Sequence, residues 1–186
     1  NKFLSHIRET DAIAEVVRCF EDENITHVSG SVDPLRDIDI INTELCLADL
    51  ETTQKRADRL NKIAKSGDKA AKAELAVLEK VLTCLENGEG ARKAQLTKDE
   101  LPLLKELNLL TLKPILYICN VAEDEAATAT ENPLVQKVTE FAAAEGSQVV
   151  AVSAKIESEI AELPDDEAAM FLEELGLPEA GLTKLI

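Results

Sequence analysis

The chain has few aromatic residues and few histidines. Aromatic side chains make up 3% of its 186 residues, Trp is absent and only two His occur. Proteins that bind single-stranded nucleic acid stack the bases on aromatic side chains, so this shortage argues against such a surface. The four cysteines are far apart and form no C-x-x-C pair. This pattern argues against a zinc site and favours reduced thiols in a cytoplasmic protein.

Long apolar runs and positive charge are also lacking. No apolar run approaches the roughly 20 residues that a membrane-spanning helix needs, so we expect no membrane segment. Lys and Arg number 20 against 36 Asp and Glu, which gives a net charge of −16. A broad basic patch for nucleic acid, including sequence-specific binding to DNA, is therefore not expected. The apolar content of 45% is sufficient for a folded core.

A phosphate-binding loop of the form G-x-x-x-x-G-K-[ST] occurs nowhere in the sequence. The chain begins with Asn1 rather than Met, has no signal-like segment and ends within the apolar stretch 181–186. These features predict an internal piece of a longer protein, with the phosphate half of any nucleotide site upstream. Below, "intact protein" means this chain together with any residues that precede or follow it.

Two apolar runs are each followed by a polar loop. The run 113–119 leads into Asn-Val-Ala-Glu at 120–123, and the run 148–152 leads into Ser-Ala-Lys at 153–155. A helical pattern at 133–145 lies between them. The order strand, Asn-x-x-acid loop, helix, strand, Ser-Ala-Lys loop is how P-loop GTPase-like domains build a nucleobase pocket. The expected ligand is therefore a purine nucleotide.

The residues of the first loop bear on the choice of base. Asn120 has both a donor and an acceptor, so it can bind a purine edge or connect neighbouring loops. GTPases usually have Asp at the fourth position, where it accepts from guanine N1–H and N2–H, and adenine lacks these donors. Glu123 is one methylene longer, and Val121 stands where Lys is usual, so each change weakens selection for guanine. In the second loop, Ser153, Ala154 and Lys155 can offer backbone N–H groups to the base.

Each of these motifs also has a simpler interpretation. Asn-x-x-Glu can be a polar loop after a buried strand, and Ser153 can be the cap of a strand-to-helix turn. His27 lies among polar residues and can orient a water or stabilise charge on a phosphate, or it can be an ordinary surface histidine. His27 is the candidate catalytic residue, and no metal ligand is predicted within the chain.

The middle of the chain has a helical pattern. Asp33-Pro34 predicts the start of a helix that runs to about Lys65, and Ser66-Gly67-Asp68 predicts a break. A second helix follows, with a coiled-coil seam that we expect to face Ile38, Ile41 and Leu45. The seam residues are Ala71, Leu75, Leu78, Leu82 and Leu85. Thr97 and Glu100 predict a capping box and a shorter helix to about Asn108.

Strand patterns lie on both sides of this helical block, at 12–20 before it and at 113–119 and 148–152 after it. A helical insertion into an α/β sheet fits this order better than two consecutive domains. We predict a partial P-loop NTPase (G domain) sheet interrupted by an antiparallel coiled-coil insertion. The expected domains are 1–32, the first part of the G domain; 33–111, the insertion; and 112–186, the second part with the base-recognition loops.

The chain resembles the Obg-like ATPase family, known in bacteria as YchF, in the Obg branch of P-loop NTPases. The resemblance covers essentially the whole chain and is strongest at 1–13, 16–20, 27–30, 41–45, 110–114, 120–124 and 157–163. It implies a G domain with a coiled-coil insertion and a TGS domain beyond Ile186. It also implies a preference for ATP over GTP, Mg²⁺ with ligands upstream of Asn1, and a loop histidine corresponding to His27 that replaces the usual catalytic Gln.

The resemblance further implies a cytoplasmic protein that binds ribosomes and regulates translation or stress responses. We therefore expect part of an ATPase that hydrolyses ATP to ADP and phosphate, with the 186-residue chain alone inactive. Two alternatives stay open. One is a GTPase of the Obg type, and the other is a coiled-coil interaction module whose nucleotide site is vestigial.

Overall fold

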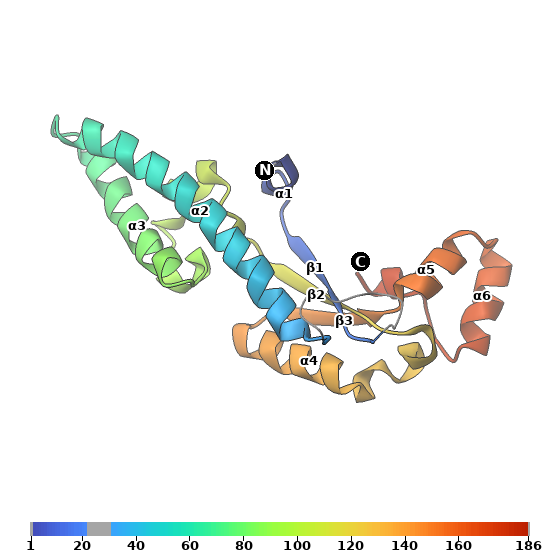
Figure 1. Ribbon diagram of the computed structural model, residues 1–186. Helices are drawn as coiled ribbons and strands as arrows, with labels where there is room; N and C mark the ends of the chain where they lie inside the picture. Colours follow the sequence, from blue (N-terminus) through green and yellow to red (C-terminus); the bar gives the residue numbers. More distant parts are fainter. Residues whose placement is uncertain (1, 22–30, 186) are drawn as a thin grey trace. The chain divides into compact units, whose positions relative to one another are not determined.

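The computed structural model describes residues 2–21 and 31–185, and Figure 1 shows its helices and strands. These residues form two compact units. An α/β unit comprises 14–21, 31–38 and 115–185, and a helical unit comprises 2–13 and 39–114.

The sheet contains β1 (Ile13–Arg18), β2 (Ile115–Asn120) and β3 (Gln148–Val152), in the order β1-β2-β3. β2 and β3 are parallel, with Leu116 opposite Gln148 and Asn120 opposite Val152. Tyr117 and Cys119 are fully buried. A run of apolar residues of this kind is typical of a strand covered on both faces. The predicted α/β class and the parallel pairing are confirmed.

Helix α4 (Pro133–Glu145) connects β2 to β3 and covers one face of the sheet (Figure 1). Asn132 caps its first turn by accepting from Leu134 N at 2.8 Å, and Pro133 has the fixed φ that suits a first helical residue. Gly146 ends the helix with a φ of +76°, which a residue with a Cβ adopts only with strain. Phe141 packs edge-on against Tyr117, with ring centroids 5.9 Å apart. The local signals at both ends explain why the expected range 133–145 matches the structure.

Two further helices follow β3, namely α5 (Ala154–Ala161) and α6 (Asp165–Glu174). The first of them begins directly after β3, at Ala154. The reason is the cap: Ser153 Oγ accepts from Ile156 N at 3.3 Å, so the helix starts directly after the strand. The loop after β2 forms 3₁₀ turns over Glu123–Glu131.

The helical unit is dominated by α2 (Pro34–Ala64) and α3 (Lys69–Glu86), of which only the first residues of α2 belong to the α/β unit. Asp33 accepts from Arg36 N at 3.2 Å at the start of α2. Gly67 has a φ of +92° in the turn, and Asp68 accepts from Ala71 N at 2.9 Å at the start of α3. The predicted helix, break and second helix are all present, because each boundary has its own capping residue.

The α2 and α3 hairpin buries a continuous apolar seam, but the part of α2 near its start does not face this seam as predicted. Ala71, Leu78 and Leu85 are buried as expected, while Leu75 and Leu82 are partly buried. On α2, the residues packed into this core are Cys46, Leu50, Ala57, Leu60 and Ala64. Ile38, Ile41 and Leu45 are not in this core, because a hairpin pairs residues at equal distances from its turn. Because both helices rise by the same distance per residue, Leu85 packs level with about residue 48 of α2 and not with residues nearer the start of α2.

A buried carboxylate joins α2 to the segment that follows the hairpin. Asp49 is fully buried and accepts from Leu110 N at 2.8 Å, Thr111 N at 2.7 Å and Thr111 Oγ1 at 2.7 Å. Thr111 Oγ1 in turn accepts from Ala91 N at 2.8 Å. The Thr97 and Glu100 capping box is present, with two reciprocal bonds of 3.2 Å, but it precedes a 3₁₀ helix at Leu101–Leu107 rather than an α-helix.

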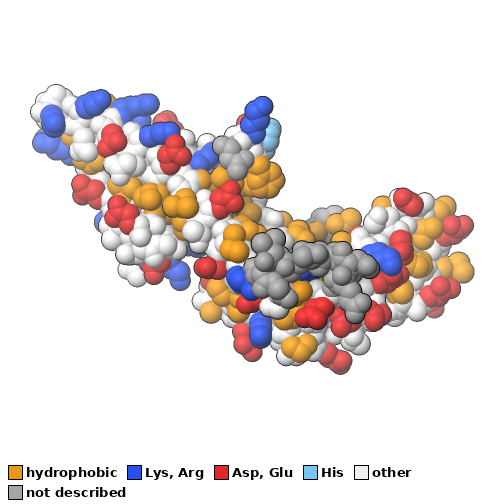
Figure 2. Space-filling model, in the orientation of Figure 1, with side chains coloured by type: hydrophobic (Ala, Val, Ile, Leu, Met, Phe, Trp, Pro, Cys, Tyr) orange, Lys and Arg blue, Asp and Glu red, His pale blue; other side chains and the backbone are white. Residues whose placement is uncertain are grey.

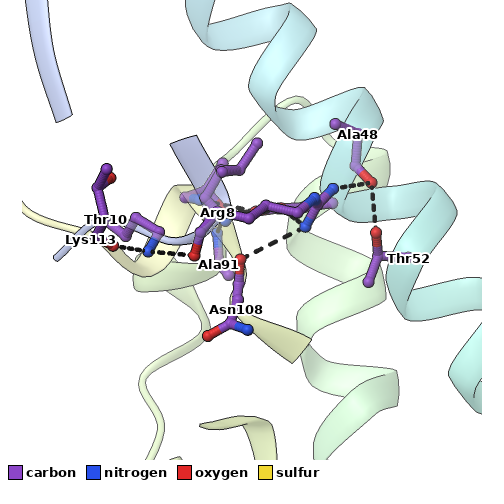
Figure 3. A network of polar contacts seen from close by, with 10 residues as sticks. Arg8, Thr10, Ala48, Thr52, Ala91, Asn108 and Lys113 are labelled. Carbon is purple, nitrogen blue, oxygen red and sulfur yellow. Dashed lines mark hydrogen bonds and ion pairs between the residues drawn. The ribbon is translucent and has the colours of Figure 1, made fainter. Parts of the chain in front are cut away.

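The short helix α1 (Lys2–Arg8) is held by polar contacts within the helical unit, shown in Figure 3. The Arg8 guanidinium donates to the carbonyl of Ala48 at 3.4 Å and to that of Asn108 at 3.5 Å. Lys113 Nζ donates to the carbonyls of Arg8, at 3.2 Å, and Thr10. Arg8 also lies 3.8 Å from Asp49 and supplies the buried carboxylate with a counter-charge.

Candidate functional site

The loops after β2 and β3 meet at one edge of the sheet. Asn120 ends β2 directly opposite Val152, the last residue of β3, so the two loops leave the sheet side by side. In open α/β sheets, ligands bind outside the carboxyl ends of the strands, which is where these loops lie. The structure therefore brings the predicted Asn-x-x-Glu and Ser-Ala-Lys loops together.

Asn120 connects the two loops through its side chain. Its Oδ1 accepts from Ala154 N at 2.9 Å. Because this bond uses the amide oxygen, the amide Nδ2 is left as the donor for a ligand. The backbone supports the same arrangement, since Val121 N donates to Val152 O at 2.8 Å. Of the two roles considered for Asn120, connecting the loops is seen directly, and it leaves a donor for a purine edge.

Glu123 and Lys155 form an ion pair between the loops. Lys155 Nζ lies 3.0 Å from Glu123 Oε2, with 71% of the lysine side chain and 33% of the glutamate side chain exposed. The nearby carboxylate raises the pKa of Lys155, mainly through the hydrogen bond that it accepts. The Glu123 carboxylate therefore already has a cationic partner.

Val121 and Ser153 are both buried, with 2% and 3% of their surfaces exposed. Val121 contributes an apolar wall beside the loop, and Ser153 caps α5 through its Oγ. The simpler interpretation of Ser153 as a helix cap is thus confirmed, and its hydroxyl is occupied by that role.

An open cavity of about 860 Å³ lies in front of these loops, within the α/β unit. This volume is suitable for a ligand of nucleotide size. Five of its lining residues are predicted ones, namely Asn120, Val121, Glu123, Ser153 and Lys155. The others are Phe20, Glu21, Ala122, Asp124 and Leu175.

Phe20 and Leu175 are the apolar lining residues that sequence reasoning missed. Phe20 was detectable, because it follows β1, and β1 ends at the same edge as β2: Cys19 N donates to Asn120 O at 2.8 Å. Leu175 directly follows α6, and no local pattern points to it. Asn132 was also missed; besides capping α4, it donates to Cys19 O at 3.0 Å and so holds the end of β1 to the start of α4.

One predicted site residue has no counterpart in the described part of the chain. His27, the candidate catalytic residue, lies outside the described residues. Across residues 2–21 and 31–185, no group of three or more His, Cys, Asp or Glu side chains is arranged to hold a metal ion. The search of the same residues for a helix long and apolar enough to cross a membrane also finds none.

The parallel sheet, the paired loops at its edge and the helical hairpin inserted between β1 and β2 are the features of a partial P-loop NTPase fold of the G-domain type. No protein-family model matches the chain. Individual proteins do match it over its whole length. It is 55% identical to "Ribosome-binding ATPase YchF" of Bacillus subtilis and 55% identical to the protein of the same name from Haemophilus influenzae, covering 51% and 50% of those proteins.

The solved "Structure of the Schizosaccharomyces pombe YchF GTPase" matches the whole chain with a TM-score of 0.85 and 33% identity. The chain covers 50% of that structure and about half the length of the curated relatives. The resemblance to the Obg-like ATPase (YchF) family is therefore confirmed: the chain is homologous, from end to end, to one half of these proteins.

Proposed function

We propose that the intact protein is a cytoplasmic, Mg²⁺-dependent ATPase that binds ribosomes, hydrolyses ATP to ADP and phosphate, and regulates translation or a stress response. The names of the relatives from Bacillus subtilis and Haemophilus influenzae, both ribosome-binding ATPases, support this proposal. We also keep the division into a G domain at 1–32 and 112–186 and an insertion at 33–111. In this proposal the present chain supplies the base pocket and is inactive by itself.

The observation that best supports nucleotide binding is the hydrogen bond from Ala154 N to Asn120 Oδ1 beside a cavity of suitable size. It fixes the two loops as one surface at the carboxyl ends of adjacent parallel strands. It also assigns the roles of the Asn120 amide atoms, because the oxygen is used and the Nδ2 donor can meet a purine ring acceptor, which adenine and guanine share. The residues present thus fit a purine base.

The ion pair of Lys155 with Glu123 supports a preference for adenine. A guanine requires a carboxylate that accepts from N1–H and N2–H, but Lys155 already neutralises this one at 3.0 Å. Recruiting Glu123 for guanine would break the ion pair, whereas adenine makes no such demand. Phe20 and Leu175 provide apolar surface in the cavity, against which a base can pack.

Phosphoryl transfer to water depends on positioning and on charge stabilisation. Bound Mg²⁺ would supply charge neutralisation at the phosphates, with ligands outside this chain. Within the chain, we propose that His27 positions the attacking water or stabilises developing charge. The basis is its chemistry, since imidazole titrates near neutrality and both donates and accepts.

A GTPase remains the second candidate, because the Schizosaccharomyces pombe relative of known structure is described as a GTPase. A carboxylate at position 123 is also the group that guanine would need if the ion pair opened. An interaction module with a vestigial nucleotide site is the third candidate, and it predicts no nucleotide binding.

Measuring ATP and GTP binding to the intact protein, with and without Asn120→Ala, tests the proposal. The substitution should weaken binding of both nucleotides by about tenfold or more. It removes the Nδ2 donor, and it also removes the side-chain oxygen that holds the Ser-Ala-Lys loop. Asn61→Ala, at an exposed position on the hairpin, is the matched control and should change nothing. Tighter binding of GTP than ATP would favour the GTPase, and no binding of either nucleotide would favour the interaction module.

A further inference from the structure

Leu175 reaches the base cavity, but its own helix gives it little support there. It lines the cavity and directly follows α6 (Asp165–Glu174). Helix α6 buries none of its residues, and Figure 2 shows acidic and apolar side chains exposed together at this end of the α/β unit. A residue of a binding site needs neighbours whose packing and hydrogen bonds hold it in place. For Leu175, we find these contacts in the residues that follow it.

The chain leaves α6 through a tight turn that determines its direction. Leu177 N donates to Leu172 O at 2.9 Å, and Gly176 N donates to Glu173 O at 3.0 Å, which are the two hydrogen bonds of a Schellman motif. Gly176 has the left-handed φ of +72° that this motif requires. Beyond the turn the chain returns from α6 to the sheet (Figure 1). We call residues 176–185 the C-terminal segment.

The C-terminal segment is fixed to the sheet at Gly181, which is buried. Gly181 N donates to Glu157 Oε1 at 2.6 Å. A Cβ at position 181 would lie 2.9 Å from Val152 Cβ and still closer to Val152 Cγ1, nearer than non-bonded carbon atoms approach. Only glycine lets the backbone come this close to the strand. We call Glu157 and Gly181 together the anchor.

The anchor lies directly beside the base loops. Val152 is the last residue of β3, and its carbonyl accepts from Val121 N at 2.8 Å. Glu157 stands in the first turn of α5, which begins at Ala154 of the Ser-Ala-Lys loop. The helix dipole favours an acid in this turn, but it does not require the bond to Gly181. That bond is charge-assisted and therefore stronger than a neutral one, so it holds the C-terminal segment to the elements that form the other wall of the cavity.

We propose that Glu157 and Gly181 are positioning residues for the nucleobase, which hold the C-terminal segment so that Leu175 packs against the base in the cavity. This inference deepens the proposed nucleotide binding and rests on it. An apolar side chain packs equally well on adenine and guanine. Leu175 therefore adds affinity for a purine ring, while the choice between the two purines stays with Glu123 and Lys155.

The test uses the intact protein with Leu175→Ala, Glu157→Ala and the two substitutions combined. Leu175→Ala removes the proposed contact with the base, and Glu157→Ala removes the acceptor of the Gly181 N–H. Glu157→Gln keeps a side-chain oxygen that can accept this bond. Glu179→Ala, at an exposed position of the C-terminal segment, is the matched control for the loss of a carboxylate. Circular dichroism establishes that each variant is folded.

Calorimetry measures the binding of ATP, GTP and tripolyphosphate, which has the phosphates but no base, each in the presence of Mg²⁺. Leu175→Ala and Glu157→Ala should each bind ATP and GTP about 5-fold to 10-fold more weakly, because less apolar surface is buried against the base. The KM for ATP should rise, whereas kcat and the binding of tripolyphosphate should not change. Glu157→Gln and the control Glu179→Ala should behave like the parent protein.

The combined variant separates positioning from a general loss of stability. It should bind ATP no more weakly than Leu175→Ala alone, because the anchor acts on the base only through Leu175. If the two substitutions weakened the fold at independent places, their effects on binding would add instead.

Three results would overturn the inference while the parent protein still binds ATP. The first is parent-like ATP affinity in Leu175→Ala or in Glu157→Ala. The second is an equal loss of ATP and tripolyphosphate binding in Glu157→Ala, and the third is additive losses in the combined variant. Tighter binding of GTP than ATP by the parent would overturn the preference for ATP and leave this inference standing. If the parent protein binds no nucleotide, the proposed function fails, and the inference fails with it.

Discussion

Lys155 and Glu123 show how a contact between two loops can change the meaning of a sequence motif. An acid at the fourth position of Asn-x-x-acid is the group that selects guanine in GTPases, yet here its carboxylate lies 3.0 Å from a lysine of the neighbouring loop. Selection for guanine over adenine then depends on how readily the ion pair of Glu123 with Lys155 opens. The pair is partly exposed to solvent, which screens it, so a modest effect on base preference is expected.

Removing the lysine should shift base preference toward guanine. In the intact protein, Lys155→Ala frees Glu123 to accept from guanine N1–H and N2–H, and a well-made bidentate contact to a base is worth about 1–3 kcal/mol. We expect the ratio of GTP to ATP affinity to rise by about 5-fold to 10-fold, measured by competition binding. Lys184→Ala, another exposed lysine of the α/β unit, should leave the ratio unchanged. An unchanged ratio in Lys155→Ala would show that backbone groups select the base.

Val121 is a buried position and is therefore unsuitable for a test of base preference. Because it is only 2% exposed, restoring the Lys that GTPases have at this position would bury an ammonium group beside the sheet. A loss of folding would then obscure any change in base preference. Substitutions at Lys155 and Glu123 test the same question at positions that face solvent.

His27→Ala in the intact protein should lower ATP turnover far more than ATP binding. General acid–base or water-positioning groups contribute about 10²-fold to 10⁴-fold, and a surface histidine contributes nothing measurable. Single-turnover hydrolysis and equilibrium binding separate the two effects, with His6→Ala as the matched control. Hydrolysis by His27→Ala within about twofold of the parent rate would identify the histidine as a bystander.

At the scale of secondary-structure elements, Asp49 determines how α2 is joined to the segment after the hairpin. Its two oxygens accept three hydrogen bonds from Leu110 and Thr111, and Arg8 lies 3.8 Å away. The carboxylate is fully buried, so each of these partners would lose its acceptor if the charge were removed. A single residue therefore links α1, α2 and the 3₁₀ turn at Leu110–Leu112.

Asp49→Asn should destabilise the chain by about 2–4 kcal/mol. The amide keeps one acceptor but places an NH₂ group against a backbone N–H or the Thr111 hydroxyl, and an unsatisfied buried donor costs roughly 1–3 kcal/mol. Urea unfolding followed by circular dichroism measures the change. Asp58→Asn, on an exposed position of the same helix, should alter the free energy of unfolding by less than about 0.5 kcal/mol. Equal stability of the two variants would mean that the three hydrogen bonds contribute little.

At the scale of the whole molecule, the chain combines two compact units with an uneven distribution of charge and a protected set of thiols. Cys19 and Cys119 are fully buried in the sheet region, Cys46 is buried in the helical unit and Cys84 is half-buried. The hydrogen bond to Cys119, together with burial, raises the pKa of Cys19, and burial raises the pKa values of Cys46 and Cys84. The same hydrogen bond lowers the pKa of Cys119, so full burial alone protects that thiol. For the other three, a raised pKa reduces the supply of reactive thiolate.

Native protein at mildly alkaline pH should therefore react with a thiol reagent at one position first. We expect Cys84 to be labelled rapidly and Cys19, Cys46 and Cys119 only on unfolding, because reaction requires an accessible thiolate. Counting modified thiols by mass spectrometry against time provides the measurement, and Cys84→Ser should remove the fast phase. Labelling of Cys19 or Cys119 as fast as Cys84 would show that the sheet edge beside Asn120 opens readily.

Much of the secondary structure was predictable, because its signals are local. The cap at Asn132, the glycine at 146 and the break at 66–68 each act within a few residues, so 133–145, 148–152 and the long α2 helix lie where expected. The position of the base loops was also predictable, since parallel strands leave a sheet at the same edge. His27 stays a prediction, because it lies outside the described residues.

The contacts that give the site its specificity required the tertiary structure. The bond of Asn120 with Ala154 and the ion pair of Glu123 with Lys155 each join residues more than 30 positions apart, and Leu175 reaches the cavity from beyond a further helix. In the sequence, nothing distinguishes Asp49 from a surface carboxylate. Only the folded structure brings Leu110 and Thr111 to it. Hydrogen bonds and caps within a few residues are determined by the local sequence, whereas pairings across loops and the register of a hairpin depend on how whole elements pack.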